Sequence, residues 1–583
     1  MKTFKTFYAS FAFICLGLVP ISAMGQSMPH TFTANSAARA SEMNANFTYL
    51  LERFSGIRET TVNCGNSGTG SGINTAIQNG YNSIVINGIC KENIKLDGTE
   101  ENIPRLLKLR GANNDASQDK IIDNSSYTEH VLTFSHAGGL LVTIDNLTIS
   151  GGDRGITTWM NVNLLIRNSK VEGYKNRGIT LQGNSVMQGE NLTIDGSYSG
   201  ATTEEQGLRM WGGAVAHIAE NLTITNNQNY GLYIKSLSLF SSSANITLTG
   251  NGRAIDVDRA SFLSHSNITI SGSTDKAINV AQGLFKSNNT TITNTPGNNF
   301  NSWMSNIYIK NLTATGDGST DKALMAFNKS VGSLYSLSIS NSGGDGLQFY
   351  NSDIAIDNLT SSNNKGNGLD ADMSRIEIMN SVISGNEDDG IDIGNGSSLS
   401  VKSSTISSNL DDGIAVRTGS YANIRDSTTI SNNTDDGIRV SEGSILEIEN
   451  STITGKAGEK AIIGYNNSTL ILTESSSGTT LISTTNANAI YLINSFGEIR
   501  DGVTVTSDTT GIGLIMNSSL RIVEGATVNG AISGGWRSTI DIENASTISS
   551  PILCDSGTQT ILIIDNATSQ GKTIGNTCIK IAR

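Results

Sequence analysis

One stretch, Gly390 to Asp412, holds the pattern that decides the fold: GIDIGNGSSLSVKSSTISSNLDD. It divides into three short runs, Ile391–Ile393, Leu399–Lys402 and Thr405–Ser407, in which aliphatic and polar residues alternate. Alternation with a period of two predicts half-buried strands. Gly, Asn and Asp are common between the runs, where a turn can require a positive φ. We therefore expect these residues to form one coil of three strands.

The same coil recurs along most of the chain, where a Gly or Ala followed by an aliphatic residue marks each repeat. Most markers lie 22 to 24 residues apart; one interval is 29, and one of 46 is two periods whose middle marker is lost near Pro296 to Phe300. Stacked coils bury aliphatic columns that a single coil cannot bury. We therefore expect an all-β parallel β-helix, with a looser period after about residue 465. The markers begin at Gly155, Gly178, Gly207, Gly231, Ala254, Ala277, Ala323, Gly346, Gly368, Gly390, Gly413, Gly437 and Ala461.

The two ends of the chain differ from the repeats. Residues 1–25 combine Lys2 and Lys5 with an apolar run and small residues, which predicts a signal peptide and export to the periplasm, the cell surface or the medium. Within residues 26–58 an apolar stripe predicts a short helix that serves as a cap, a connector or an oligomerising coiled coil. We expect the β-helix over 59–583, with a C-terminal cap near 550–583. The stripe consists of Met43, Phe47, Leu50, Leu51 and Phe54.

Charge and cysteine content restrict the partners and the compartment. The net charge is −13, and loss of both lysines with the signal leaves 37 basic against 52 acidic residues, a net charge of −15. This charge disfavours nucleic acid and anionic membranes, and no later stretch predicts a membrane span. Four cysteines remain, and in an oxidising compartment we expect the local bridges Cys64–Cys90 and Cys554–Cys578, although other connectivities are open.

The repeat resembles that of the right-handed parallel β-helix superfamily, which includes pectate-lyase-like proteins, over roughly residues 60–583. This superfamily contains lyases, hydrolases, epimerases and adhesins, so the resemblance implies the fold and no single activity. In such relatives the outer face of the first strand and the neighbouring turns often hold a glycan. The resemblance therefore directs attention to the outward residues two and four positions after each marker.

Three successive coils place a mixed aromatic and charged patch at those positions. Arg209 can neutralise the carboxylate of a uronic acid, and Lys235 or Tyr233 can take the α-proton in a lyase reaction. Trp211, Asp256 and Asp258 complete the predicted contact with substrate. A loop inserted around Ser197 to Gln206 lies just before the patch. The alternative is a solvated strand face with Arg–Asp pairs between coils.

A second cluster is acidic. Asp-Asp-Gly strings recur at intervals of 23 and 24 residues, and stacked carboxylates of uncompensated charge favour a bound cation. Oxygen ligands on turns suit Ca²⁺, whereas the alternative is ordinary turn chemistry. The candidate ligands are Asp388, Asp389, Asp411, Asp412, Asp435 and Asp436.

Parts of this acidic segment also resemble polygalacturonase-type hydrolases. Asn367 to Asp370 and Asp388 to Ile393 are similar to the Asp-bearing strings of that family, but its Gly-His-Gly and Arg-Ile-Lys elements are missing. We therefore expect a secreted or surface β-helix that engages an acidic polysaccharide, with lyase activity as one form of that function. The alternatives are a non-catalytic adhesion or display protein and, less favoured, a hydrolase with paired carboxylates. Oligomeric state stays open.

Overall fold

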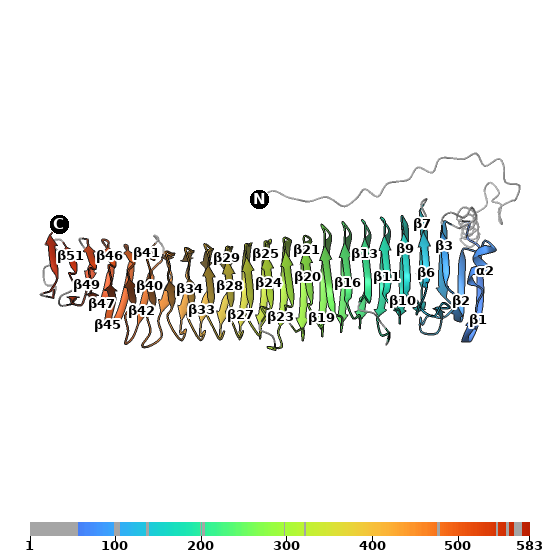
Figure 1. The fold of residues 1–583 in the computed structure, drawn as a ribbon, viewed down its shortest axis with the longest axis horizontal. Helices are drawn as coiled ribbons and strands as arrows, with labels where there is room; N and C mark the ends of the chain where they lie inside the picture. The colour runs from blue at the N-terminus through green and yellow to red at the C-terminus, as the bar shows by residue number, and fades with distance from the viewer. Residues whose placement is uncertain are drawn as a thin grey trace, which may run out of the picture. The chain divides into compact units, whose positions relative to one another are not determined.

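The computed structural model describes residues 56–582 except 98–104, 136–138, 199, 201–203, 297, 320–321, 475–477, 544–545, 556–558, 565–573 and 576. Residues 60–583 form one compact unit. This unit is a stack of about 21 coils, whose strands lie side by side and pair in parallel from one coil to the next (Figure 1). The all-β parallel β-helix predicted from the repeat is confirmed. The predicted signal peptide and the helical stripe from Met43 to Phe54 lie outside the described residues.

The strands of each coil contribute to three sheets that run along the stack. Sheet 1 carries the Gly-aliphatic and Ala-aliphatic markers and pairs along the whole stack. Its strands are β3 (Ile94–Asp97), β6 (His130–Ser135), β9 (Arg154–Trp159), β11 (Arg177–Gln182), β13 (Gln206–Trp211), β16 (Tyr230–Lys235), β18 (Arg253–Asp258), β20 (Ile278–Ala281), β22 (Phe300–Trp303), β24 (Met325–Asn328), β26 (Leu347–Tyr350), β28 (Leu369–Asp372), β31 (Ile391–Gly394), β34 (Ile414–Val416), β37 (Ile438–Val440), β40 (Ile462–Tyr465), β43 (Ile490–Ile493), the ends of β45 (Val503–Ile515) and β47 (Thr527–Gly534), and β50 (Ile552–Cys554).

Sheets 2 and 3 are formed by the rest of each coil, and many strands bend from sheet 2 into sheet 3. Asn168 and Asn191 stand at two such bends with φ of 44° and 48°, a conformation that Asn adopts readily. The bending strands are β2 (Ser83–Lys91), β10 (Val162–Glu172), β12 (Val186–Asp195), β17 (Leu239–Thr249), β19 (Phe262–Ser271), β21 (Leu284–Thr293), β23 (Asn306–Thr315), β25 (Val331–Ser340) and β27 (Asp353–Ser362).

In the other coils, sheets 2 and 3 have separate strands. Those of sheet 2 are β4 (Leu106–Gly111), β7 (Leu140–Asp145), β14 (Val215–Ile218), β29 (Arg375–Met379), β32 (Ser398–Lys402), β35 (Tyr421–Arg425), β38 (Ile445–Glu449), β41 (Thr469–Thr473), β44 (Phe496–Ile499), β46 (Ser519–Ile522), β48 (Thr539–Ile542), β51 (Ile561–Ile564) and β52 (Ile579–Ala582). Those of sheet 3 are β5 (Lys120–Ile122), β8 (Thr148–Ser150), β15 (Leu222–Thr225), β30 (Val382–Ser384), β33 (Thr405–Ser407), β36 (Thr429–Ser431), β39 (Thr452–Thr454), β42 (Thr480–Thr484), β49 (Thr547–Ile548) and the first halves of β45 and β47.

The coil that begins at Gly390 shows why the pattern folds in this way. Its three predicted strands are β31, β32 and β33, each within one residue of the expected bounds. Ile391 and Ile393 are fully buried, whereas Asp392 between them points outward. A Cβ on Gly390 would come within 2.5 Å of the carbonyl oxygen of Gly413 in the next coil. Gly at this marker therefore permits the close approach of consecutive coils.

The interval of 46 residues does contain a complete coil. Phe300 of β22 pairs in register between Ile278 and Met325, so a phenylalanine takes the place of the usual aliphatic residue. Its ring packs 5.4 Å from Phe285 and 5.4 Å from Phe327, and Phe349 continues the row at 5.1 Å from Phe327. Four aromatic rings therefore fill this part of the core, where the marker is lost from the sequence.

The front end of the stack is covered by strand β1 (Glu59–Gly70) and the short helix α2 (Ile73–Gln78), which the sequence did not predict (Figure 1). The Glu92 carboxylate accepts hydrogen bonds from the backbone N–H groups of Gly72, Ile73 and Asn74, so it satisfies donors that the first helical turn leaves free. Ile73 and Ile77 are buried against the first coils. No helix of the described residues is long and apolar enough to cross a membrane.

Two disulfides tie the ends of the stack and confirm the predicted pairs. Cys64 bridges to Cys90, and Cys554 bridges to Cys578, with Cα atoms 5.1 and 5.2 Å apart. Structural disulfides of this kind indicate an oxidising, extracellular environment.

Candidate functional site

The outer face of sheet 1 brings the six predicted glycan-contacting residues together. Arg209, Tyr233 and Asp256 stand in register on β13, β16 and β18. Two residues further along each strand, Trp211, Lys235 and Asp258 form a parallel row. The inward neighbours Leu208, Leu232 and Ile255 are fully buried, which fixes the alternation that turns the six side chains outward.

Aromatic and cationic side chains contact one another within this patch. The Arg209 guanidinium lies 6.0 Å from the centre of the Trp211 ring, and Lys235 Nζ lies 5.5 Å from the centre of the Tyr233 ring. Trp211 Nε1 donates a hydrogen bond of 2.9 Å to Ser236 Oγ, which fixes the orientation of the indole. Trp211 is 43% exposed, so much of its surface is available for stacking against a sugar ring.

The two predicted carboxylates are already paired with arginines. Asp256 is 4% exposed; its Oδ2 lies 3.0 Å from Arg253 Nη1 and accepts a hydrogen bond of 3.3 Å from Asn279. Burial raises the pKa of Asp256, and Arg253 opposes the rise. Asp258 lies 3.4 Å from Arg259 Nε. Asp256 therefore positions Arg253 and offers little surface to a ligand, which weakens its predicted role as a substrate contact.

Sequence reasoning missed two further arginines on this face. Arg154 and Arg177 directly precede the markers Gly155 and Gly178, and they stand in register on β9 and β11. Together with Arg209 they form the arginine cluster. Burial, followed by the positive charges of Arg154 and Arg209, lowers the pKa of Arg177 to about 10. The three guanidiniums therefore lie close enough to repel one another.

Part of the arginine cluster lacks hydrogen-bond acceptors within the described part of the chain. The buried Nε atoms of Arg154, Arg177 and Arg209 have no hydrogen-bond acceptor among the described residues. Asp153 Oδ2 lies 3.4 Å from Arg154 Nε without hydrogen-bond geometry, and the exposed Glu204 lies 3.8 Å from Arg177 Nη2. His130 adds no charge near neutral pH, because burial, followed by Arg154, lowers its pKa to about 4.

Buried hydroxyls beside the guanidiniums also lack partners. Thr157 and Thr180 precede Arg209 in the same register column, both are fully buried, and neither Oγ1 has a hydrogen-bond partner among the described residues. Gln206 pairs in register with Arg177, and its Oε1 atom likewise has no hydrogen-bond partner among the residues that the structure describes. Buried polar groups rarely stay unsatisfied, so such a concentration indicates a place for an ordered water or a ligand.

The inserted loop borders this face, although Ser199 and residues 201–203 lie outside the described residues. Tyr198 stacks on Tyr127 with ring centres 4.4 Å apart. Glu205 is fully buried, and burial raises its pKa to about 7 although it accepts a hydrogen bond from the Gln228 backbone N–H. Glu205 therefore anchors the loop and does not reach the open face.

The acidic strings form a ladder along the stack. Each rung accepts a hydrogen bond from the backbone N–H one coil later, with distances of 2.7 to 3.2 Å. Asp389, Asp412 and Asp436 are 2%, 0% and 4% exposed, so these side chains are structural elements of the turns. The rungs are Asp345, Asn367, Asp389, Asp412 and Asp436.

Cations lie beside the ladder, so the expectation of uncompensated charge is wrong for its inner members. Arg439 Nε lies 2.7 Å from Asp412 Oδ2, Lys460 Nζ lies 3.5 Å from Asp436 Oδ1, and Arg417 Nη2 lies 3.7 Å from Asp389 Oδ2. Burial, followed by the charge of Asp389, still raises the pKa of Asp412 to about 8. Burial likewise raises the pKa values of Asp389 and Asp436 to about 6, and the nearby charges of Arg439 and Lys460, respectively, oppose these rises.

The outer residues of the same strings differ from the ladder in exposure. Asp388 is exposed, and Asp411 is half-buried. Carboxylate oxygens of Asp388, Asp389 and Asp411 lie within 4.8 Å of one another, and Asp411, Asp412 and Asp435 form an equivalent group. The geometry is thus compatible with a Ca²⁺ site, which stays a prediction.

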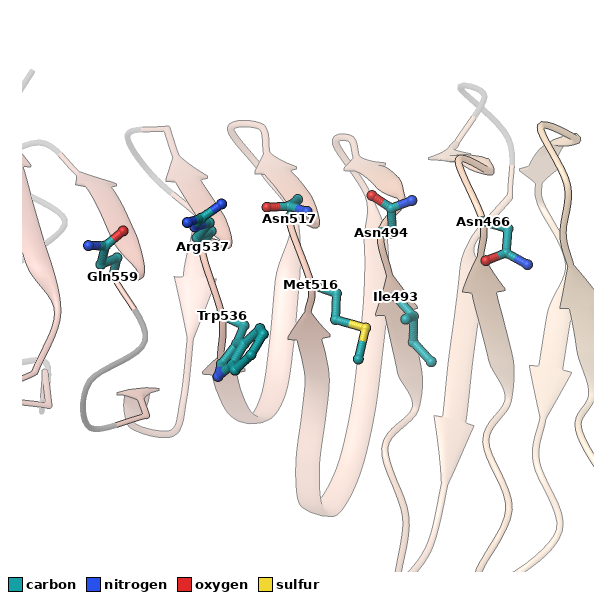
Figure 2. Close-up of a pocket in the computed structure, with 8 residues that line it drawn as sticks. All are labelled: Asn466, Ile493, Asn494, Met516, Asn517, Trp536, Arg537 and Gln559. Atoms are coloured by element: carbon teal, nitrogen blue, oxygen red, sulfur yellow. The ribbon is translucent and has the colours of Figure 1, made fainter.

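A separate hollow of about 680 Å³ lies near the C-terminal end of the stack (Figure 2). Trp536, Met516 and a row of amide side chains from successive coils line it, and Arg537 is the charged residue of the lining. Trp536 is 70% exposed and has a φ of 32°. The lining offers no carboxylate–base pair, so we do not place an acid–base reaction there.

Comparison with known proteins identifies the architecture. Residues 322–485 match the model of a protein family described as a right handed beta helix region. The chain is a right-handed parallel β-helix. No curated protein matches the sequence of this β-helix.

Several solved structures are similar to this β-helix. The A-module of the Azotobacter vinelandii mannuronan C-5 epimerase AlgE4 has 14% identity, covers 84% of this chain and 100% of the module, and gives a TM-score of 0.22. Tailspike protein 3 of bacteriophage CBA120 has 11% identity, 74% coverage of this chain, 59% coverage of the tailspike and a TM-score of 0.27. At these scores the likenesses carry no argument about activity.

Proposed function

We propose that this β-helix binds an acidic polysaccharide on the outer face of sheet 1, over β9, β11, β13 and β16. The arginine cluster supports the proposal, because three crowded guanidiniums whose buried Nε atoms find no hydrogen-bond acceptor among the described residues are a costly arrangement, even in a protein of net charge −13. Carboxylates of the ligand would satisfy these donors with charge-assisted, bidentate hydrogen bonds. Trp211 and Tyr233 would stack on the adjoining sugar rings.

A lyase reaction is the catalytic form of this proposal. Arg209 would neutralise the uronate carboxylate, and Lys235 or Tyr233 would take the α-proton at C5. The electron pair left at C5 would form the C4–C5 double bond as the C4–O glycosidic bond breaks, and the departing sugar oxygen would take a proton from water. Lys235 belongs to the coil that follows that of Arg209, so the two groups would flank one bound sugar ring. A non-catalytic adhesion or display surface would use the same contacts without turnover.

The test is a binding panel of polygalacturonate, alginate and hyaluronan, with neutral dextran as the reference polymer, measured by titration calorimetry. Arg177→Gln and Arg209→Gln should each weaken binding of the acidic polymer about tenfold, a loss of one charge-assisted contact. Arg521→Gln is the matched control, because Arg521 pairs with Glu543 on sheet 2. Equal binding of dextran, or no effect of either cluster substitution, would refute the proposal.

The catalytic form has its own readout. A lyase releases an unsaturated product whose ultraviolet absorbance grows with time, and Lys235→Ala should abolish that signal without abolishing binding. Binding without any absorbance change supports the adhesion alternative. If new reducing ends appear without the unsaturated product, the hydrolase alternative is favoured, and the next substitutions would be Asp370→Asn and Asp392→Asn.

A further inference from the structure

Aromatic side chains recur in one register column at the ends of the sheet 1 strands. Pairing links Trp211 to Trp303 through Lys235, Asp258 and Ala281. The same column continues from Trp303 through Asn328 to Tyr350. In the other direction, Gln182 pairs with Trp211. Trp159 belongs to the same column, because Trp159 and Gln182 directly follow the paired residues Thr158 and Leu181.

These rings are accessible. Trp159, Trp211, Trp303 and Tyr350 are 38%, 43%, 40% and 42% exposed. The chain has only 4 tryptophans, so three of them share this column. Large exposed aromatics in register are unfavourable on a surface without a partner, and they indicate a binding surface.

The spacing matches a long ligand that lies parallel to the axis of the stack. Parallel strands are about 4.8 Å apart. Two coils separate Trp159 from Trp211, four separate Trp211 from Trp303, and two separate Trp303 from Tyr350. The aromatic column therefore extends over about 38 Å. A single sugar or a disaccharide cannot reach both ends of it.

The surroundings of the column favour a sugar polymer over a membrane or an apolar protein surface. Polar residues separate the aromatics in the same column: Gln182, Lys235, Asp258 and Asn328, with Ala281 as the small apolar member. The Asp258 carboxylate lies 3.4 Å from Arg259 Nε, so its charge is paired. A hollow of about 430 Å³ lies at the far end, lined by Tyr350 together with Asn301, Asn328, Gln348 and Lys322. Flat apolar rings next to hydrogen-bonding groups suit the faces and hydroxyls of sugars.

The arginine cluster at one end of the column supports an acidic polymer. The arginine cluster lies on β9, β11 and β13, beside the Trp159–Trp211 end of the column. We propose that one chain of an acidic polysaccharide lies along the column from Trp159 to Tyr350, with its carboxylates at the arginine cluster. This inference rests on the proposed function and adds the direction and length of the bound polymer.

The test compares polygalacturonate with its disaccharide by titration calorimetry, using the full protein. Trp303→Ala should weaken binding of the polymer about tenfold, the loss of one stacking contact, and leave binding of the disaccharide at the arginine cluster unchanged. Trp303→Tyr, which keeps an aromatic ring, should restore most of the affinity. Trp536→Ala is the matched control, because Trp536 is exposed but lines the separate hollow near the C-terminal end of the stack (Figure 2).

Each outcome separates the column from the proposed function. If wild type binds both ligands and Trp303→Ala changes neither affinity, the proposed role of the column is wrong and the arginine site stands. The same conclusion follows if Trp536→Ala weakens binding of the polymer as much as Trp303→Ala does. If wild type binds neither polygalacturonate nor its disaccharide, nor the other acidic polymers of the panel, both proposals fail. A dimer of wild type that Trp303→Ala converts to a monomer would assign the column to a second copy of this chain and overturn the proposal.

Discussion

Replacement of Asp412 by Asn should stabilise the β-helix at alkaline pH. Asp412 is fully buried, and burial followed by the charge of Asp389 raises its pKa from 3.8 to about 8. A carboxylate with a raised pKa weakens the folded state as the pH rises from the unfolded to the folded value. Asparagine keeps the acceptor for the Asp436 backbone N–H and removes the charge. Asn367 already fills an equivalent rung of the ladder.

The magnitude follows from the pKa values. One pKa unit corresponds to about 1.4 kcal/mol, so the whole rise corresponds to an upper bound of about 6 kcal/mol at pH values above 8. Neighbouring carboxylates of the ladder titrate together and share part of this cost. We therefore expect Asp412→Asn to raise the free energy of unfolding by about 2–3 kcal/mol at pH 8. At pH 4 the effect should be small, because the folded carboxyl is protonated and the pH is close to the unfolded-state pKa of 3.8.

Thermal unfolding of wild type and variant at both pH values is the assay. Wild type should lose stability between pH 4 and pH 8, and Asp412→Asn should flatten that slope. Asn367→Asp is the reciprocal control, because it adds a carboxylate to a neutral rung and should steepen the slope. A variant that is less stable than wild type at pH 8 would refute the reasoning and show that the Arg439 ion pair outweighs the burial of the charge.

Two further predictions concern the metal and the disulfides. Millimolar Ca²⁺ should bind the outer acidic groups and raise the melting temperature, with about 2.7 kcal/mol of added stability at 100 times the dissociation constant. Asp411→Asn should reduce this rise. If neither Ca²⁺ nor a chelator changes the melting temperature, the acidic strings serve only as turns. The double variant Cys554→Ser/Cys578→Ser should lower the free energy of unfolding by about 3 kcal/mol, measured as a lower unfolding temperature by circular dichroism. An unchanged unfolding temperature would show that the C-terminal coils are equally stable without the disulfide.

Much of the fold could be predicted because the repeat encodes its own register. The marker glycines place coils on top of one another, and the alternation around residues such as Ile391 and Ile393 assigns the inward faces. Both disulfides followed from the position of the cysteines near the ends of the repeat. Helix α2 did not follow, because six residues are too few for a periodic signal and its cap, Glu92, comes from a later strand.

The candidate site was predictable only in part. Counting two and four residues after each marker found Arg209 and Trp211 but passed over Arg154 and Arg177, although the string Arg-Gly-Ile-Thr occurs twice at an interval of 23 residues. Trp303 was missed for a different reason, because its coil has Phe300 in place of an aliphatic marker. Counting from markers fails where the core residue changes.

The cations beside the acidic ladder show a limit of the same kind. Arg439 follows the marker of a later coil, and only the stacking of coils brings it to Asp412. The sequence shows the acidic period clearly but not which coil supplies the opposite charge. The pairing of an aspartate in one coil with a cation from another coil can therefore be identified only in the structure.

The central claim is that the arginine cluster recognises carboxylates of a polysaccharide. The most direct measurement compares the affinity of wild type for polygalacturonate and alginate with its affinity for the same polymers after reduction of their carboxyl groups to alcohols. The account predicts binding of at least one acidic polymer and at least a tenfold loss, about 1.4 kcal/mol, for its reduced form. Equal affinity for the acidic and reduced forms would contradict it.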